Sequence, residues 1–296
     1  MKIAVIGAGK WGSALFDALS VKNECVITSR TPRQIPHFVS VSEALECEAL
    51  VFALAAQQTA QWLDQNFTYK NQKILVASKG IDVASGRFLN EIFESHVARG
   101  NLAYLSGPSF ATEVMQKLPC ALVVSSCNEN LAELFAGAFP AYIKTYTSGD
   151  IIGAEVCGAY KNVIAIASGV CDGLELGNNA RASLIARGIV EIARFGKFFG
   201  ARDETFLGLS GVGDLFLTAS SALSRNYRVG LGLARGKGLE EILRELGEVA
   251  EGVATTEAVV NIAAKHKIYA PIATEVAQIL RGKDVRASLK DLLRKK

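Results

Sequence analysis

The glycine pattern near the start of the chain constrains its fold more than any other feature. Gly7-Ala-Gly9-Lys-Trp-Gly12 follows a strand-like apolar run, Lys2–Ile6, and opens a helix-like stretch, Trp11–Leu19. In such a strand–turn–helix unit, Gly7 permits a tight turn, Gly9 lets the backbone approach a pyrophosphate, and Gly12 lets the helix pack closely on the strand. The free N–H groups at the start of the helix favour a phosphate. The pattern predicts a dinucleotide site, and a glycine-rich turn without a ligand is the alternative.

The rest of the first half alternates between short apolar runs and helix-like stretches. This alternation predicts βαβ units and a buried parallel sheet, that is, a Rossmann-like doubly wound α/β fold. The further strands are expected at Cys25–Ser29, Leu50–Ala53, Ile74–Ala77, Leu102–Leu105, Ala121–Ser125 and Ile143–Thr147. Helices are expected at Thr59–Asn66, Phe88–Ala98 and Leu131–Ala138.

After about Ser148 the strand-like runs disappear. The remaining apolar stretches have helical spacing. They are Ile151–Val170, Ala180–Phe199, Leu239–Leu246, Thr255–His266, Ile272–Leu280 and Val285–Leu293. We therefore predict two domains: a dinucleotide-binding α/β domain over residues 1–148 and an all-α substrate and catalytic domain over residues 149–296.

Composition excludes several classes of protein. The chain has 296 residues, half of them hydrophobic, and a formal net charge of +3, so it is not a disordered chain. A nucleic-acid partner is not expected, because the one basic cluster, Arg294-Lys295-Lys296, is typical of a solvated helix end. No metal is expected either, since His37, His96 and His266 lack metal-ligand spacing with one another or with cysteine.

The sequence also predicts a compartment. No apolar run approaches the ~20 residues of a membrane-spanning helix, and no secretory signal precedes the first predicted strand. No CxxC pair occurs among the cysteines, which indicates mostly buried free thiols in a reducing compartment. The six are Cys25, Cys47, Cys120, Cys127, Cys157 and Cys171. We expect a soluble cytoplasmic protein without a membrane span.

The residues after the second predicted strand bear on cofactor choice. NAD-preferring sites carry Asp or Glu there to hold the ribose 2′-hydroxyl. This chain has Ser29-Arg30-Thr31, with Arg33 close behind. Arginine pairs with a 2′-phosphate and stacks on adenine. We therefore expect NADP(H) to be preferred and NAD(H) to be possible, with a plain surface arginine as the alternative.

Two lysines lie where an ordinary core would not place them. Lys161 interrupts the apolar helix Gly158–Ala167, beside Asn162, and a buried ammonium must be paired or deprotonated. Either state makes Lys161 a candidate proton carrier. Lys79 follows a predicted strand, at the end where open α/β sheets bind ligands, and Ser106-Gly107-Pro108-Ser109 follows the next strand. The alternatives are a structural ion pair or solvent exposure for Lys161 and a surface loop for Lys79.

Two later segments add polar groups. Gly211-Val-Gly-Asp214 places a carboxylate after a flexible glycine pair. Ser224-Arg225-Asn226 presents hydroxyl, guanidinium and amide groups together, a set suited to a phosphate ester. A turn aspartate and a Ser224 helix cap are the alternatives.

Together these segments resemble the bacterial NAD(P)-dependent glycerol-3-phosphate dehydrogenases over nearly the whole chain. The glycine fingerprint and the Lys-Asn helix occur in other dehydrogenases, whereas Gly211–Leu215 and Ser224–Asn226 together, in this order and spacing, are more particular to the family. The resemblance rests on Gly7–Gly12, Ser78–Gly80, Leu105–Ala111, Gly158–Ala165, Asp172-Gly173, Asn178–Arg181, Gly211–Leu215, Ser224–Asn226 and Val249–Gly252.

The resemblance implies reversible NAD(P)H-dependent reduction of dihydroxyacetone phosphate to sn-glycerol 3-phosphate for phospholipid synthesis. It implies Lys161 as proton donor and acceptor, assisted by Lys79 and Asp214. The implied substrate contacts are Lys79, Gly107, Ser109, Lys161, Asp214, Ser224, Arg225 and Asn226. The implied dinucleotide contacts, beyond the three glycines, are Lys10, Trp11, Arg30, Lys79, Ala111, Arg225, Val249 and Glu251.

Some positions depart from the family pattern, and other functions stay open. Lys10 replaces a usual serine, the segment Arg33–Ser42 is short, Ala53–Ala56 lacks a common proline, and Ala219 replaces a frequent cysteine. A β-hydroxyacid dehydrogenase of the same build is one alternative, and a non-enzymatic NADP-binding sensor is another. The apolar faces of the helical domain make a homodimer possible.

Overall fold

The computed structural model describes residues 1–294. Of the basic C-terminal cluster, Lys295 and Lys296 lie outside the described residues, and the side chain of Arg294 forms an ion pair with Asp291 at 3.2 Å. Contacts within the chain define two compact units. The first comprises Met1–Lys79 and Leu89–Glu155, and the second comprises Gly80–Phe88 and the chain from Val156 onward.

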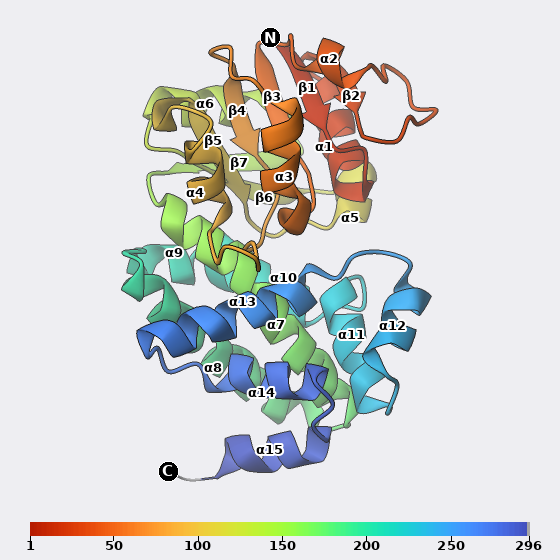
Figure 1. Cartoon of the computed structure of the whole chain (residues 1–296), viewed down its shortest axis with the longest axis vertical. Helices are drawn as coiled ribbons and strands as arrows, with labels where there is room; N and C mark the ends of the chain where they lie inside the picture. The colour runs from red at the N-terminus through yellow and green to blue at the C-terminus, as the bar shows by residue number, and fades with distance from the viewer. Residues whose placement is uncertain (295–296) are drawn as a thin grey trace. The chain divides into compact units, whose positions relative to one another are not determined.

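A seven-stranded sheet forms the centre of the first unit (Figure 1). Its strands are β1 (Lys2–Ile6), β2 (Glu24–Thr28), β3 (Ala49–Phe52), β4 (Lys73–Val76), β5 (Leu102–Ser106), β6 (Cys120–Ser125) and β7 (Ile143–Ser148). They lie in the order β2-β1-β3-β4-β5-β6-β7, so the direction of winding reverses between β1 and β3. In open α/β sheets, ligands bind at the carboxyl ends of the strands that flank such a reversal.

The prediction of a wholly parallel sheet is wrong at one place. β5 and β6 are antiparallel, with Leu105 opposite Val124, while β6 and β7 are parallel to each other. The connection between β5 and β6 contains only the five-residue helix α5 (Ala111–Met115). A helix of that length spans about 8 Å, too short to carry the chain back along a strand, so β6 starts from the end where β5 stops.

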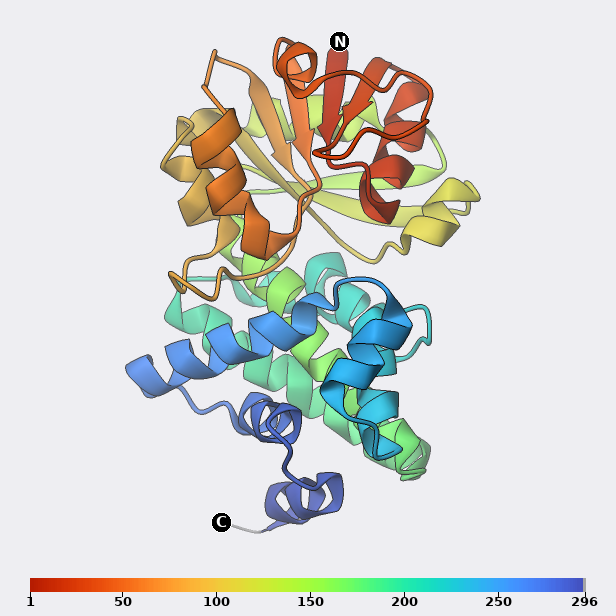
Figure 2. The same ribbon diagram turned by 45° about the vertical axis from the view of Figure 1, so that its right-hand side comes forward.

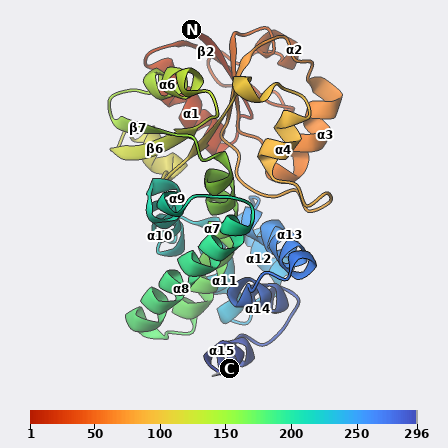
Figure 3. The same ribbon diagram turned by 90° about the vertical axis from the view of Figure 1, so that its left-hand side faces the viewer.

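Helices cover both faces of this sheet, and each face has its own apolar core (Figure 3). One core packs α1 (Lys10–Ser20), α5 and α6 (Glu129–Ala138) against side chains such as Val5 and Val51. The other packs α2 (Val41–Ala44), α3 (Ala56–Asn66) and α4 (Leu89–Glu94) against Ile6 and Phe52. Strands buried on both faces carry continuous apolar runs, which is why these strands were recognisable in the sequence.

The second unit is helical among its described residues. Its last helix, dark blue in Figure 2, packs beside the one before it. The helices are α7 (Ile151–Gly173, of which the residues up to Glu155 belong to the first unit), α8 (Gly177–Phe198), α9 (Asp203–Leu207), α10 (Asp214–Ala219), α11 (Arg225–Ala234), α12 (Leu239–Leu246), α13 (Glu251–His266), α14 (Pro271–Leu280) and α15 (Val285–Leu293). Each unit also has one short helical turn. The first unit has a 3₁₀ turn at Arg99–Asn101, and the second has a π-helical turn at Leu209–Gly213.

The helix α7 is the one described helix long and apolar enough to cross a membrane by length and composition. Of its most apolar window, 94% is buried inside the protein. That burial fits the core helix of a folded domain.

All seven predicted strands are confirmed, with ends shifted by one residue at most. The helix predicted at Phe88–Ala98 is shorter, because the chain after α4 turns into the 3₁₀ turn that leads to β5. The helix α11 was not predicted from the sequence, because its glycines lower helix propensity. Those glycines allow close packing: a Cβ on Gly230 would lie 2.0 Å from the carbonyl oxygen of Ile166 on α7.

Candidate functional site

The glycine turn between β1 and α1 is fixed by close contacts. Gly7 has a φ of +114°, and a Cβ there would lie 2.5 Å from the carbonyl oxygen of Ala53. A Cβ on Gly12 would lie 1.7 Å from the carbonyl oxygen of Gly7. Both positions therefore require glycine for the fold itself, and they hold the start of α1 against the ends of β1 and β3.

Gly9 differs from its two neighbours in the motif. A Cβ on Gly9 would have no atom of the described chain within 4 Å, and its φ of −77° is open to any residue. Among the described residues, no side chain caps the N-terminus of α1, and its first turn contains no acidic residue. An uncapped helix N-terminus beside a bare glycine, at the reversal of winding order, fits a dinucleotide pyrophosphate.

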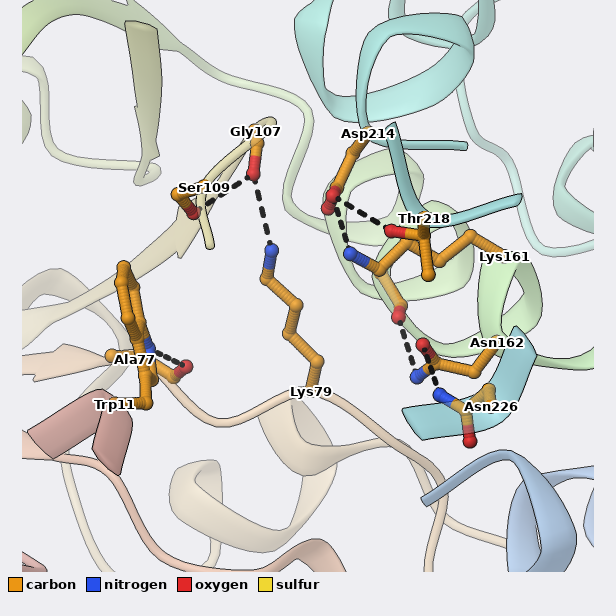
Figure 4. Close-up of polar contacts among 11 residues, drawn as sticks. Trp11, Ala77, Lys79, Gly107, Ser109, Lys161, Asn162, Asp214, Thr218 and Asn226 are labelled. Atoms are coloured by element: carbon orange, nitrogen blue, oxygen red, sulfur yellow. Dashed lines mark hydrogen bonds and ion pairs between the residues drawn. The ribbon is translucent and has the colours of Figure 1, made fainter. Parts of the chain in front are cut away.

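Other expected dinucleotide residues lie around the same edge of the sheet. Trp11 on α1 donates its indole N–H to the carbonyl oxygen of Ala77, after β4, at 3.0 Å (Figure 4). Arg30 is exposed directly after β2, and Lys10 is exposed at the first position of α1. Ala111 is the first residue of α5. In the first unit, the carboxyl ends of β1, β2 and β4 thus carry most of the expected dinucleotide set.

Lys79 and the Gly107 turn meet within the first unit. The half-buried Lys79 directs its Nζ toward the carbonyl oxygen of Gly107, at 3.4 Å, and the hydroxyl of Ser109 donates to that same oxygen at 3.2 Å (Figure 4). Gly107 has a φ of +105°, and a Cβ there would lie 2.9 Å from the carbonyl oxygen of Ala121. The turn is therefore rigid, and it places an ammonium and a hydroxyl side by side after β4 and β5.

A buried ion pair joins α7 and α10 in the second unit. The Lys161 side chain on α7 and the Asp214 carboxylate on α10 form a direct contact, and both residues are buried, at 8% and 1% exposure (Figure 4). The hydroxyl of Thr218, one turn after Asp214, donates to the same Asp214 oxygen at 3.4 Å. A charge pair that is nearly excluded from water needs such close partners to remain ionised.

The expected flexibility before Asp214 is wrong. Leu209–Gly213 forms one π-helical turn that leads straight into α10. A Cβ on Gly211 would lie 2.1 Å from the carbonyl oxygen of Phe206, so this glycine serves close packing and not mobility. The tight turn fixes the direction in which Asp214 enters the unit.

The side-chain amides of Asn162 and Asn226 and the backbone N–H of Gly252 are joined by hydrogen bonds. Asn226 donates to the side-chain oxygen of Asn162 at 2.9 Å and accepts the backbone N–H of Gly252 at 2.9 Å. The Asn162 amide also donates to the carbonyl oxygen of Gly158, one turn earlier on α7, at 3.4 Å. The two asparagine side chains therefore connect the start of α11 and the start of α13 to α7.

The remaining expected residues of the second unit lie at the same helix starts. The Ser224 side chain caps α11 by accepting the N–H of Tyr227 at 3.3 Å, so the helix-cap reading of Ser224 is confirmed. Arg225 is exposed and pairs with Glu248 at 3.4 Å. Val249 is 55% exposed, and Glu251 is the first residue of α13.

Hydrogen bonds to Asp172 hold the first turn of α11 against α7. The Tyr227 hydroxyl donates to Asp172 on α7, and Arg181 on α8 donates to the same Asp172 oxygen at 2.8 Å. Burial and the hydrogen bond to Asp172 raise the pKa of Tyr227 to about 12. Because Tyr227 follows Asn226 directly, this cluster fixes the position of that amide.

No group of three or more potential metal ligands occurs among the described residues. All six cysteines are free. Four are buried, Cys120 is half-buried and Cys127 is exposed, which agrees with the prediction of mostly buried thiols.

Comparison with known proteins decides the family. A family model described as the NAD-dependent glycerol-3-phosphate dehydrogenase N-terminus matches residues 27–132, and the model of its C-terminus matches residues 150–290. The chain belongs to the NAD-dependent glycerol-3-phosphate dehydrogenase family. The resemblance drawn from the sequence motifs is thereby confirmed.

Similar glycerol-3-phosphate dehydrogenases match over the full length. The glycerol-3-phosphate dehydrogenase [NAD(P)+] of Campylobacter lari is 63% identical over 296 residues, which are 100% of this chain and 99% of the relative. That of Sulfurimonas denitrificans is 62% identical over 292 residues, 99% of each chain. A crystal structure of glycerol-3-phosphate dehydrogenase from Coxiella burnetii superposes with a TM-score of 0.91 at 31% identity, covering 99% of both chains.

Sequence analysis missed three functional candidates in this glycerol-3-phosphate dehydrogenase fold. The Thr218 hydroxyl donates to Asp214. The sequence feature that could have indicated this contact is the four-residue spacing, which places both side chains on one face of a helix. Gly252 has no space for a side chain, since a Cβ would lie 2.7 Å from the Asn226 side-chain oxygen. Glu155 is a buried carboxyl on α7, and only its position inside an apolar helix hinted at a role.

Proposed function

We propose that the chain reduces dihydroxyacetone phosphate reversibly to sn-glycerol 3-phosphate with NADPH or NADH. The observation that carries this proposal is the buried pair of Lys161 and Asp214 in a chain of this dehydrogenase family. Bound NAD(P)H supplies a hydride to the carbonyl carbon. The protein must then supply a proton to the carbonyl oxygen, and Lys161 has the chemistry for that step.

The ion pair explains how one lysine serves both directions. The Asp214 carboxylate favours the ammonium form of Lys161, which stabilises the developing alkoxide and then gives it a proton. In the oxidation direction, neutral Lys161 accepts the hydroxyl proton as the hydride leaves the carbon. Thr218 and the tight turn before α10 keep the carboxylate in place throughout.

We assign the binding roles by matching residues of the family motifs. Substrate binding is assigned to Lys79, Gly107, Ser109, Lys161, Asp214, Ser224, Arg225 and Asn226. Dinucleotide binding is assigned to Gly7, Gly9, Lys10, Trp11, Gly12, Arg30, Lys79, Ala111, Arg225, Val249 and Glu251. The dinucleotide-binding domain would span residues 1–148 and the substrate domain residues 149–296. The positive φ and close contacts of Gly7 and Gly107 support turns shaped for anions.

Arg30 supports a preference for NADPH over NADH. The arginine is exposed directly after β2, where NAD-preferring sites carry an acidic residue. A guanidinium there pairs with the 2′-phosphate through two hydrogen bonds. The exposed Lys10 at the start of α1 adds a second positive charge near the pyrophosphate.

We further propose that the protein acts in the cytoplasm, in glycerophospholipid synthesis, and forms a homodimer. Six free cysteines fit a reducing compartment. The dimer proposal is supported by exposed apolar side chains on the helical unit, among them Val190 and Phe198 on α8.

The first experiment follows the absorbance of NADPH on addition of dihydroxyacetone phosphate and repeats the assay with NADH. We expect rapid oxidation, with a higher kcat/KM for NADPH because of Arg30. Turnover of 3-hydroxyacids but not of the phosphate ester would favour the β-hydroxyacid alternative. NADPH binding without turnover of any of these substrates would favour the sensor alternative.

The glycine motif offers a matched pair of variants. Gly12→Ala forces a Cβ against backbone, so we expect a clearly lower melting temperature, from a loss of about 2 kcal/mol or more. Gly9→Ala meets no atom and should melt like the wild type, yet bind NADPH about tenfold more weakly, because its methyl group occupies the pyrophosphate approach. Scanning fluorimetry and NADPH titration measure the two effects, and tight NADPH binding by Gly9→Ala would contradict the assignment.

A further inference from the structure

Two motifs of the family resemblance have no role in the reaction described above. Asp172-Gly173 ends α7, and Asn178–Arg181 lies near the start of α8. Hydrogen bonds connect the two motifs. Arg181 donates through one guanidinium nitrogen to the Asp172 carboxylate and through another to the side-chain oxygen of Asn178, each at 2.8 Å. These contacts fix the direction of the Asp172 carboxylate.

The Asp172 oxygen that accepts from Arg181 also accepts the hydroxyl of Tyr227, in the first turn of α11. The Tyr227 residue is 8% exposed, and the Asp172 side chain is 18% exposed. Arg181 balances the negative charge of the carboxylate at this half-buried place. A hydrogen bond to an ionised acceptor is roughly twice as strong as one between neutral groups. The Tyr227 hydroxyl is therefore held firmly.

Glycines line the contact between α11 and α7. A Cβ on Gly169 of α7 would lie 2.0 Å from the carbonyl oxygen of Tyr227. A Cβ on Gly230 of α11 would lie 2.0 Å from the carbonyl oxygen of Ile166. Helices that pack backbone against backbone interlock less than helices whose large side chains fit into grooves. The bond from Tyr227 to Asp172 lies at this contact and fixes the position of one helix along the other.

The start of α11 carries groups that the proposed function assigns to the substrate. Arg225 and Asn226 directly precede Tyr227, and the Ser224 hydroxyl accepts the backbone N–H of Tyr227 at 3.3 Å. A displacement of Tyr227 therefore moves all three of these residues. The ion pair that carries the proton belongs to α7 and α10 and does not depend on the start of α11.

We propose that Tyr227 and Asp172 are positioning residues that set the affinity for the phosphate ester. Their hydrogen bond holds the first turn of α11 where the hydroxyl, guanidinium and amide groups of Ser224–Asn226 converge on the substrate. A site that is ordered before binding loses less entropy when the ligand arrives, so its affinity is higher. Arg181 acts one step behind, by orienting Asp172. This inference rests on the proposed function, in which Ser224–Asn226 bind the substrate.

A second contact between a tyrosine and a carboxylate provides a matched control. Tyr160 on α7 is fully buried, and its hydroxyl donates to Glu191 on α8 at 2.9 Å. Glu191 also accepts the backbone N–H groups of Ile272 and Ala273 at the start of α14, each at 2.9 Å. Removal of the Tyr160 hydroxyl breaks the same kind of bond in the same unit, but it affects α14 instead of α11.

The test measures KM and kcat for dihydroxyacetone phosphate in the wild type, Tyr227→Phe and Tyr160→Phe. In Tyr227→Phe, KM should rise about tenfold, the scale of one hydrogen bond to a charged group, while kcat stays within about twofold. In Tyr160→Phe, KM should match that of the wild type, although both variants lose stability. Calorimetric titration with sn-glycerol 3-phosphate should show the same pattern without turnover.

A double-mutant cycle identifies the bond itself as the cause. Asp172→Asn alone should also raise KM. Its combination with Tyr227→Phe should raise KM no further than the larger of the two single effects, because both substitutions weaken the same contact. The pH limbs of kcat should remain those of the wild type in all three variants. Fully additive increases in KM would show that the two residues act separately and would contradict the proposal.

The outcomes separate this inference from the proposed function. Turnover by folded Tyr227→Phe with the wild-type KM would overturn the positioning role and leave the proposed function intact. An equal rise in KM in Tyr160→Phe would do the same, since it would be a general effect of lost packing. Absence of turnover and of glycerol 3-phosphate binding in the wild type would reject both. If Tyr227→Phe does not fold, Arg181→Gln decides: KM should rise severalfold, and an unchanged KM overturns the proposal.

Discussion

Replacing Lys161 with methionine is expected to reduce kcat for dihydroxyacetone phosphate about 10³-fold while leaving NADPH binding nearly unchanged. The loss combines the missing proton donor with the missing charge at the developing alkoxide. NADPH affinity should persist because the glycine turn at Gly7–Gly12 belongs to the first unit, whereas Lys161 belongs to the second. Methionine has a similar length to lysine and fills the apolar surroundings on α7.

Two further measurements make the Lys161 test specific. Lys161→Arg keeps a positive charge beside Asp214 but cannot release a proton at neutral pH, so it should be nearly as inactive as Lys161→Met. NADPH titration and melting temperature show whether each variant is folded and able to bind. Turnover within tenfold of the wild type in Lys161→Met would contradict the proton role.

The strands and the dinucleotide turn could be predicted because they depend on local sequence. A strand buried on both faces has a continuous apolar run, and the Gly7–Gly12 pattern follows from contacts within one βα unit. The direction of β6 could not be predicted in the same way. It depends on the length of α5, and five residues with no strong periodicity give no signal.

The contacts of the site join residues that lie far apart in the sequence, and a single sequence does not show which of them meet. Lys161 was recognisable as a charge in an apolar helix, whereas its pairing with Asp214 joins residues 53 positions apart. Asn226 was predicted to be near the substrate, yet its partners Asn162 and Gly252 come from two other helices. Glu155 went unnoticed because a carboxyl in a helix is ordinarily solvated, and only the fold shows that it is enclosed.

Asp214→Asn tests how the enzyme keeps Lys161 protonated. The substitution keeps the shape and a hydrogen-bonding oxygen but removes the negative charge beside a buried ammonium. Without that charge, burial favours the neutral amine and therefore lowers the pKa of Lys161. The reduction needs the ammonium form, so its rate at neutral pH should fall about tenfold, as expected if Lys161 then behaves like a buried lysine without a carboxylate partner, and should recover as the pH is lowered.

The oxidation direction should respond differently, because it needs neutral Lys161. Asp214→Asn makes that form more abundant at any given pH, so the acid limb of the oxidation profile should move to lower pH, in parallel with the alkaline limb of the reduction profile. Asp172→Asn is the control, since the Asp172 carboxylate contacts Arg181 and Tyr227. That variant should keep the wild-type pH limbs even if it is less stable. Unshifted limbs in a folded Asp214→Asn protein would mean that the carboxylate orients Lys161 without controlling its charge.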